Sequence, residues 1–307
     1  MPFPLLAARW SALAPDTRGL AWLLGDQTIT VTIYVLVKLL GSHHSVLQIV
    51  FVRLIVGMML LSPTMVRMGP ARLWSPRWRG HLWRNVCSTL GLVCSYLALT
   101  RLPLADATVI SFTGPMVMTV LAVLLLGEKV RWRRWSAVLL GFSGVLFIVQ
   151  PSSGTPLDAV AIALFGTVVT CLGMATAKTL LRHERPVQVT VLYTVMALAM
   201  IAPLGIWAWQ WPTAAEWPLF LAIGVLSTGG QYCFLRAYAE ADAGYLAGFG
   251  YLRLLLAIAV GYLVFAEVPT KATLIGAAVI LTSALYIGLR EAQLRRAAAR
   301  GRGGAAG

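Results

Sequence analysis

Apolar segments of about twenty residues follow one another along almost the whole of this chain, separated by short charged or Pro/Gly-rich stretches. Because a helix rises about 1.5 Å per residue, about twenty apolar residues cross roughly 30 Å of hydrocarbon. Only 12% of the residues are charged, whereas an ordinary soluble domain carries roughly 25%. The chain is therefore predicted to be a multi-pass membrane protein.

Ten of these segments are predicted to be transmembrane helices, which makes the chain an all-α membrane protein. Continuous apolar runs such as residues 117–126 argue against a membrane barrel, whose strands alternate apolar and polar residues over about ten positions. The predicted helices cover residues 19–40, 45–65, 84–100, 105–126, 135–149, 158–181, 187–209, 217–239, 244–265 and 272–289.

The net charge of +14 is distributed unevenly between the two sides of the predicted membrane. If the helices alternate in direction, most of the 25 Lys and Arg residues fall on one side, and only Lys38, Arg101 and Lys271 fall on the other. Cytoplasmic loops carry this excess of basic residues, so both termini are predicted to be cytoplasmic in a bacterial-type inner membrane. Topology and anionic lipid headgroups thus explain the charge better than nucleic-acid binding.

The chain divides into two halves with a shared pattern. In the first half, Tyr96 stands ten residues before Asp106 of an Ala-Asp-Ala triplet, and in the second half Tyr232 stands ten residues before Asp242 of another such triplet. We therefore predict one five-helix repeat in residues 19–150 and a second in residues 155–290. Residues 1–18 are predicted to be a cytoplasmic lead-in, and residues 291–307 a basic, disordered cytoplasmic tail.

An odd number of helices in each half predicts that the two repeats are inserted in opposite orientations. The helix after each triplet ends in a glutamate, which places Glu128 on the cytoplasmic side and Glu267 outside. We interpret both as helix-end charges in solvated loops. Inverted repeats typically place a substrate site near the middle of the membrane, between the halves.

The motifs of both halves resemble a known family, the EamA-type transporters of the drug/metabolite transporter superfamily. The resemblance lies in residues 96–115, 126–129 and 140–145 of the first half and in residues 236–238, 250–253, 265–267 and 275–278 of the second. One departure is Ala266, where the family usually has glycine. The resemblance implies ten helices in two inverted halves and secondary transport of amino acids, vitamins, metallophores or related metabolites, with export common.

Asp26, Arg53 and Arg253 are charged residues deep within predicted helices, where charges are costly and are functional by default. Asp26 and Arg53 each lie roughly 10 to 12 Å deep, from opposite sides of the membrane. They could form a structural ion pair, or Asp26 could take up a proton or a substrate amine while Arg53 attracts an anionic group. Arg253 has no obvious acidic neighbour in the sequence, which indicates either a carboxylate-bearing ligand or helix-end carbonyls as its partners.

Polar and aromatic side chains recur in the same helices and are further candidates for substrate contact. Thr30, Ser111 and Gln231 stand at helical spacing from other polar residues, although hydroxyl groups in membrane helices often bond to the backbone instead. Tyr96 and Tyr251 could stack on a substrate. Pro115 lies in the middle of the fourth predicted helix and could kink it.

These features favour a secondary transporter of a small polar metabolite, with export as the first choice of direction and uptake as the alternative. A proton is the favoured coupling ion, and the oligomeric state stays open. An ATP-driven pump would need a Gly-x-x-x-x-Gly-Lys-Ser/Thr loop, which the sequence lacks.

An intramembrane enzyme is the alternative from another class. All four histidines (His43, His44, His81 and His183) fall in predicted loops, and no His-Glu-x-x-His motif is present. The adjacent imidazoles of His43 and His44 are expected to face water. We therefore predict no catalytic residue, no metal site and no cofactor.

Overall fold

The computed structural model describes residues 14–69, 75–126, 132–148, 156–241 and 252–282, together with residues 246, 249, 250 and 286. All regular secondary structure within these ranges is helical. Six helical spans within the described ranges are long and apolar enough to cross a membrane, and one of them, residues 104–121, is interrupted by a turn at residues 112 and 113. The predicted tail, residues 291–307, lies outside the described residues, as do residues 1–13 of the predicted lead-in.

The helices of the first half largely follow the predicted segments. They are α2 (Pro15–Leu40), α3 (Val46–Met68), α4 (Trp78–Arg101), α5 (Leu104–Ser111), α6 (Gly114–Leu126) and α7 (Trp132–Ile148). The second half contains α8 (Leu157–Leu180), α9 (Pro186–Trp207), α10 (Trp217–Glu240), α12 (Leu252–Phe265) and a further helix, Lys271–Thr282.

The predicted helix 105–126 is in fact two helices, α5 and α6, that meet at a turn at Phe112 and Thr113. Pro115 explains the break, because it has no N–H to continue the hydrogen-bond ladder across the turn. The new helix starts instead from Thr113, whose carbonyl accepts hydrogen bonds from Met116 and Val117. In place of the expected kink within one helix, the structure has a full break, and Pro115 is the second residue of α6.

The helix predicted at 84–100 begins earlier, at Trp78. The added residues include Trp78, Arg79 and His81, which break the apolar pattern but suit the polar end of a helix near a membrane interface. As a consequence, His81 lies within α4 rather than in a loop and is only 1% exposed.

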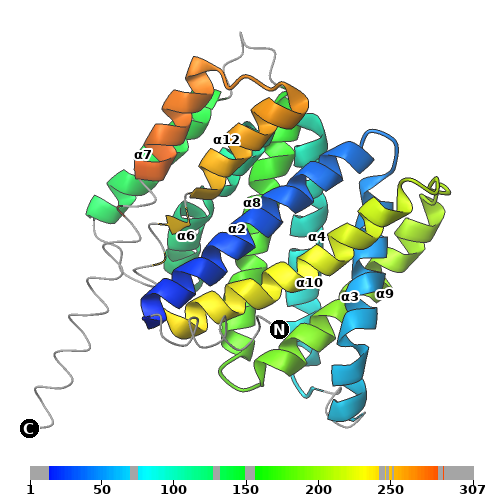
Figure 1. Cartoon of the computed structure of the whole chain (residues 1–307). Helices are drawn as coiled ribbons and strands as arrows, with labels where there is room; N and C mark the ends of the chain where they lie inside the picture. The colour runs from blue at the N-terminus through cyan, green and yellow to red at the C-terminus, as the bar shows by residue number, and fades with distance from the viewer. Residues whose placement is uncertain are drawn as a thin grey trace, which may run out of the picture.

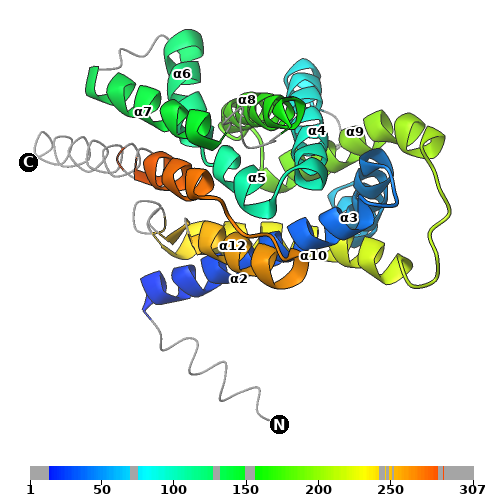
Figure 2. The same cartoon turned by 90° about the horizontal axis from the view of Figure 1, so that it is seen from above.

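The helices form two layers when viewed from above (Figure 2). One layer contains α2, α10 and α12, and the other contains α4, α6, α7 and α8. The most extensive helix contacts lie within the layers, between α2 and α10 and between α4 and α8 (Figure 1). The short helix α5 contacts both layers, through α12 on one side and α8 on the other.

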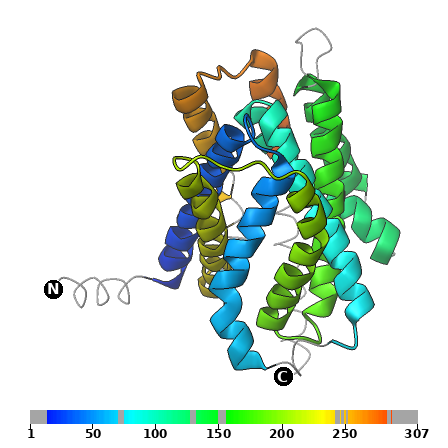
Figure 3. The same ribbon diagram turned by 90° about the vertical axis from the view of Figure 1, so that its right-hand side faces the viewer.

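One end of the bundle carries both the α2–α3 loop and the connection between α9 and α10 (Figure 3). We call this the α2–α3 end. Contacts across this end join the two halves of the chain, since His44 of the loop lies beside Glu216, which immediately precedes α10.

Small residues permit the close contact of α4 and α8. A Cβ atom at Gly91 would lie 2.1 Å from Oγ1 of Thr170, and one at Gly166 would lie 2.8 Å from Cβ of Cys94. Only glycine fits at these two positions without a shift of the neighbouring helix.

Candidate functional site

The guanidinium group of Arg53 lies between the halves of the chain, well inside helix α3. Its Nη1 donates a hydrogen bond of 2.9 Å to the hydroxyl of Tyr96 on α4, and its Cζ lies 5.6 Å from the centre of the Tyr96 ring. Tyr96 is buried. No carboxylate lies within 4 Å of Arg53 among the described residues, so no direct ion pair there balances its charge.

Tyr34 of α2 and Ser227 of α10 lie beside the Tyr96 hydroxyl. Tyr34 also lines a small cavity of about 40 Å³ between α2, α4, α5 and α8. The other residues that line this cavity are Ser95, Ala98, Leu99, Ala107, Ser111, Ala163 and Thr167. Residues from both halves of the chain thus surround a polar region next to Arg53.

The structure does not contain the Asp26–Arg53 ion pair that the sequence left open. Helix α2 ends at Leu40, so Asp26 lies about 14 residues, or roughly 21 Å, from the α2–α3 end of that helix. Arg53 lies only about 7 residues, or roughly 10 Å, from the same end of α3. The two side chains are therefore offset by about 10 Å along the bundle.

Asp26 has Arg253 as its electrostatic neighbour instead. Tyr238 of α10 lies near both charged groups, and a Cβ atom at Gly230 would lie 3.5 Å from Oδ1 of Asp26. Arg253 also stacks on Phe112, with 5.0 Å between its Cζ and the ring centre. The acidic neighbour of Arg253, which the sequence did not reveal, thus comes from the other half of the chain.

The remaining predicted site residues lie in different surroundings. Ser111 lines the small cavity, but its hydroxyl donates to the carbonyl of Thr108 at 2.6 Å, the backbone bonding expected of such residues. Thr30 is half-buried on α2, whereas Gln231 is exposed on α10 and does not line the small cavity. Tyr251 lies outside the described residues.

A second cluster, at the α2–α3 end, was not among the predicted sites. Lys38 of α2 forms an ion pair with Glu267 and also donates to the carbonyl of Leu102 at 2.8 Å. The other carboxylate oxygen of Glu267 accepts a 2.7 Å hydrogen bond from the N–H of Leu104, at the start of α5. The interpretation of Glu267 as a solvated helix-end charge is therefore wrong, because its carboxylate joins the two halves.

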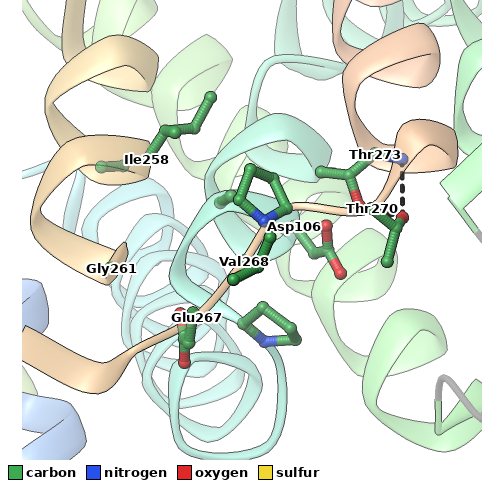
Figure 4. Close-up of a pocket in the computed structure, with 11 residues that line it drawn as sticks. Asp106, Ile258, Gly261, Glu267, Val268, Thr270 and Thr273 are labelled. Atoms are coloured by element: carbon green, nitrogen blue, oxygen red, sulfur yellow. Dashed lines mark hydrogen bonds between the residues drawn. The ribbon is translucent and has the colours of Figure 1, made fainter. Parts of the chain in front are cut away.

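A cavity of about 120 Å³ lies directly beside this ion pair (Figure 4). Asp106 of α5 lines it and is only 6% exposed. The Ala-Asp-Ala triplet and the glutamate after the next helix were the sequence signals for this cluster. They were recognised as repeat markers, but sequence spacing could not bring Asp106 and Glu267 together, because they belong to different repeats.

Two His–Glu contacts also join the halves, one at each end of the bundle. His44 is buried, with its Nε2 3.2 Å from Oε2 of Glu216, so the expectation that it faces water is wrong. Hydrogen bonds from the backbone and side chain of Thr213, together with His44, lower the pKa of Glu216 to about 2.

At the other end, Nε2 of His81 lies 2.7 Å from Oε2 of Glu184, and the hydroxyl of Ser75 donates to Oε1 of the same carboxylate at 2.5 Å. Burial raises the pKa of Glu184, but the hydrogen bonds from Ser75 and His81 outweigh it and hold that pKa below its ordinary value.

The chain is similar to several bacterial transporters. The S-adenosylmethionine uptake transporter of Rickettsia prowazekii (strain Madrid E) is 26% identical over 90% of this chain and 94% of that protein. The riboflavin transporter of Rhizobium johnstonii is 34% identical over 71% of this chain and 72% of that protein. The pseudopaline exporter CntI of Pseudomonas aeruginosa (strain UCBPP-PA14) is 29% identical over 82% of this chain and 89% of that protein.

A solved crystal structure shares the fold, with a TM-score of 0.61 over 91% of this chain and 98% of that chain, at 17% identity. The EamA-like transporter family matches the chain twice, over residues 17–150 and residues 157–289. These two matches cover nearly the whole sequence. The protein is therefore a member of the EamA-like transporter family, with the family domain present twice.

Proposed function

We propose that this protein is a secondary active transporter that moves a small polar metabolite across the bacterial inner membrane. The observation that carries the proposal is the guanidinium of Arg53, which lies within a helix, bonds to Tyr96 and has no carboxylate within 4 Å among the described residues. A cation at this position within a membrane helix is costly unless it binds something. A carboxylate of the substrate fits, because a guanidinium can bind it through two parallel hydrogen bonds.

We further propose that the two family domains are inverted relative to each other and that the α2–α3 end faces outward. Both termini are then cytoplasmic, in agreement with the excess of basic residues on that side. Substrate would reach Arg53 alternately from the two sides as the halves rock. The reciprocal contacts, α2 with α10 and α4 with α8, support this arrangement, since each pairs the first helix of one half with the third helix of the other.

The substrate is proposed to be an amino acid, an amino-acid-derived compound or a vitamin, and a proton is proposed as the coupling ion. S-adenosylmethionine and riboflavin, named for two relatives, are suitable first probes. The relatives are named for both directions of transport, uptake and export. We propose export first, and uptake is the alternative.

Counterflow in proteoliposomes tests the transport function. Vesicles that contain the full chain are loaded with unlabelled S-adenosylmethionine, riboflavin or an amino-acid mixture, and entry of the matching labelled compound is followed. We expect at least one probe to exchange, and mass spectrometry should recover it unchanged. A chemically altered compound would indicate an enzyme instead.

Arg53→Gln tests the proposed site within the same assay. The glutamine keeps polarity but cannot pair with a carboxylate as a cation, so we expect exchange to fall at least about tenfold, equivalent to about 1.4 kcal/mol. Arg101→Gln is the matched control, because Arg101 pairs with Asp158 on the exposed surface. Equal exchange by the wild type and Arg53→Gln would remove Arg53 from the site.

A further inference from the structure

Asp106 is a buried carboxyl group with an unused oxygen. It lines the cavity of about 120 Å³ at the α2–α3 end, and its Oδ1 has no hydrogen-bond partner. The cavity walls are mainly apolar, and they include Pro103, Ile258 and Val268. In Figure 4 the Asp106 carboxyl group lies on the side of the cavity nearest Thr270 and Thr273. The Thr273 hydroxyl interacts with the Asp106 carboxyl group, but burial of the unpaired Oδ1 is costly, so a positively charged or proton-bearing partner at Oδ1 would be favourable.

The other oxygens that line the cavity already have partners. Glu267 uses one carboxylate oxygen for Lys38 and the other for the N–H of Leu104. The hydroxyls of Thr270 and Thr273 lie 2.9 Å apart and bond to each other. A metal cation such as Na⁺ needs several oxygen ligands, whereas a proton needs only one. The cavity therefore favours a proton.

The charged groups around Asp106 are few among the described residues. Lys38 of α2 and Glu267, just beyond α12, act on it directly. On α4 and α8, Arg101 and Asp158 pair with each other at 2.7 Å on the exposed surface. The remaining charge on α12, Arg253, lies over Phe112 at the opposite end of α5.

We propose that Asp106 binds a proton at the outer end of the transporter and that this proton stabilises the closed outer end. The inference rests on the proposed function, for which it supplies the proton site. When the outer end is closed, as in this structure, the cavity shields the Asp106 carboxyl group from water and therefore favours its neutral, protonated form. When the Lys38–Glu267 contact opens, water reaches Asp106 and hydration stabilises the ionised carboxylate.

Proton binding and closure are therefore linked. A ligand that binds one conformation more tightly shifts the population toward that conformation, and for a single proton the shift cannot exceed about tenfold per pH unit. Lower external pH thus closes the outer end. Proton uptake from outside would in this way be coupled to the step that seals the outer side.

Cysteine accessibility tests the proposal without any substrate. In full-length protein with its four native cysteines replaced by alanine, Ile258→Cys places a thiol in the cavity wall, and Trp211→Cys places one in the exposed α9–α10 connection. A membrane-impermeant maleimide is applied to the outer face of proteoliposomes between about pH 8 and pH 5. The ratio of the two labelling rates removes the pH dependence of the reagent itself.

We expect this ratio to fall as the pH is lowered, by up to about tenfold per unit. With Asp106→Asn, whose amide mimics the neutral acid, the ratio should be low and independent of pH. Asp158→Asn, on the exposed surface, should follow the unmodified protein. Gel filtration checks whether the variants are folded. The pH titration of the protein that keeps Asp106 tests the proposal even if Asp106→Asn fails to fold.

Three results would overturn the proposal: a ratio that does not depend on pH, an unchanged pH dependence in Asp106→Asn, or a ratio that responds to replacement of Na⁺ by N-methylglucamine at constant pH. Failure of the proposed transport function would appear separately, as a lack of exchange in the counterflow assay. The labelling result would still stand in that case.

Discussion

Ala266 adopts a backbone conformation that L-residues rarely adopt, with a φ of 53°. It lies directly after α12, where its N–H donates to Tyr262 and the N–H of Glu267 donates to Gly261. This tight ending directs the Glu267 carboxylate back toward Lys38 and Leu104. The family usually has glycine at position 266, and glycine would adopt this conformation without steric strain.

Ala266→Gly should stabilise the protein. A left-handed conformation costs a non-glycine residue about 1–2 kcal/mol, and the greater flexibility of unfolded glycine offsets about 0.5–1 kcal/mol of that gain. We expect a net increase of up to about 1 kcal/mol in the free energy of unfolding, measured by denaturation in detergent. As a control, Ala278→Gly lies within an ordinary helix and should destabilise; a loss of stability in both variants would contradict the strain at Ala266.

At the residue scale, the sequence identified isolated charges better than their partners. Arg53 stood out because a charge inside an apolar segment needs a reason. Arg53 bonds to Tyr96, and Asp26 lies near Arg253. Both contacts depend on the depth at which each helix starts, and composition does not define that depth closely. Asp106 escaped notice as a site because it lies near a helix end, where acidic residues are ordinary.

At the scale of helices, the close packing of α4 against α8 depends on glycine residues at the contact positions. Gly166 and Thr170 stand four residues apart, a spacing that permits close helix approach. In the structure a Cβ at Gly166 would meet Cys94, and one at Gly91 would meet Thr170. The break between α5 and α6 was harder to predict from the sequence, because one proline is compatible with either a kink or a full break of the helix.

Gly166→Leu should push α4 and α8 apart. Even a Cβ atom there would lie 2.8 Å from Cβ of Cys94, so we expect a loss of about 1–3 kcal/mol in the free energy of unfolding. Gly229→Ala is the matched control, since a Cβ at Gly229 meets no atom within 4 Å. Thermal unfolding in detergent should separate the two variants, and equal midpoints would contradict the tight packing.

The contact of Glu216 with the α2–α3 loop should make stability depend on pH in the acid range. Hydrogen bonds from Thr213, together with the nearby His44 ring, hold the pKa of Glu216 at about 2, below its ordinary value of 4.5. Because the folded pKa is the lower one, the contribution is complete above about pH 4.5 and is lost as the pH falls toward about 2.

We expect Glu216→Gln to flatten this part of the pH–stability curve, measured by thermal unfolding in detergent between about pH 6 and pH 2.5. The glutamine cannot titrate, so the difference between the wild type and the variant should shrink as the pH falls through this window. A difference that stays constant would show that the Glu216 contacts do not favour the ionised carboxylate.

At the scale of the whole molecule, the composition and the repeated motifs were sufficient to predict a helical membrane protein with two related halves, which the double family match supports. The contacts between the halves were beyond sequence reasoning. Long stretches of chain separate the two members of each contacting pair. These pairs are Lys38 and Glu267, His44 and Glu216, and Asp26 and Arg253. Only the folded arrangement brings them together.

The most direct test of the proposed function is whether the region beside Arg53 can be reached from both sides of the membrane. Ser111→Cys, in protein with the native cysteines replaced by alanine, places one thiol in the cavity that Tyr34 also lines. A membrane-impermeant thiol reagent is applied to sealed vesicles of each orientation. We predict labelling from either side while the vesicles stay impermeable to the reagent; labelling from one side alone would contradict alternating access.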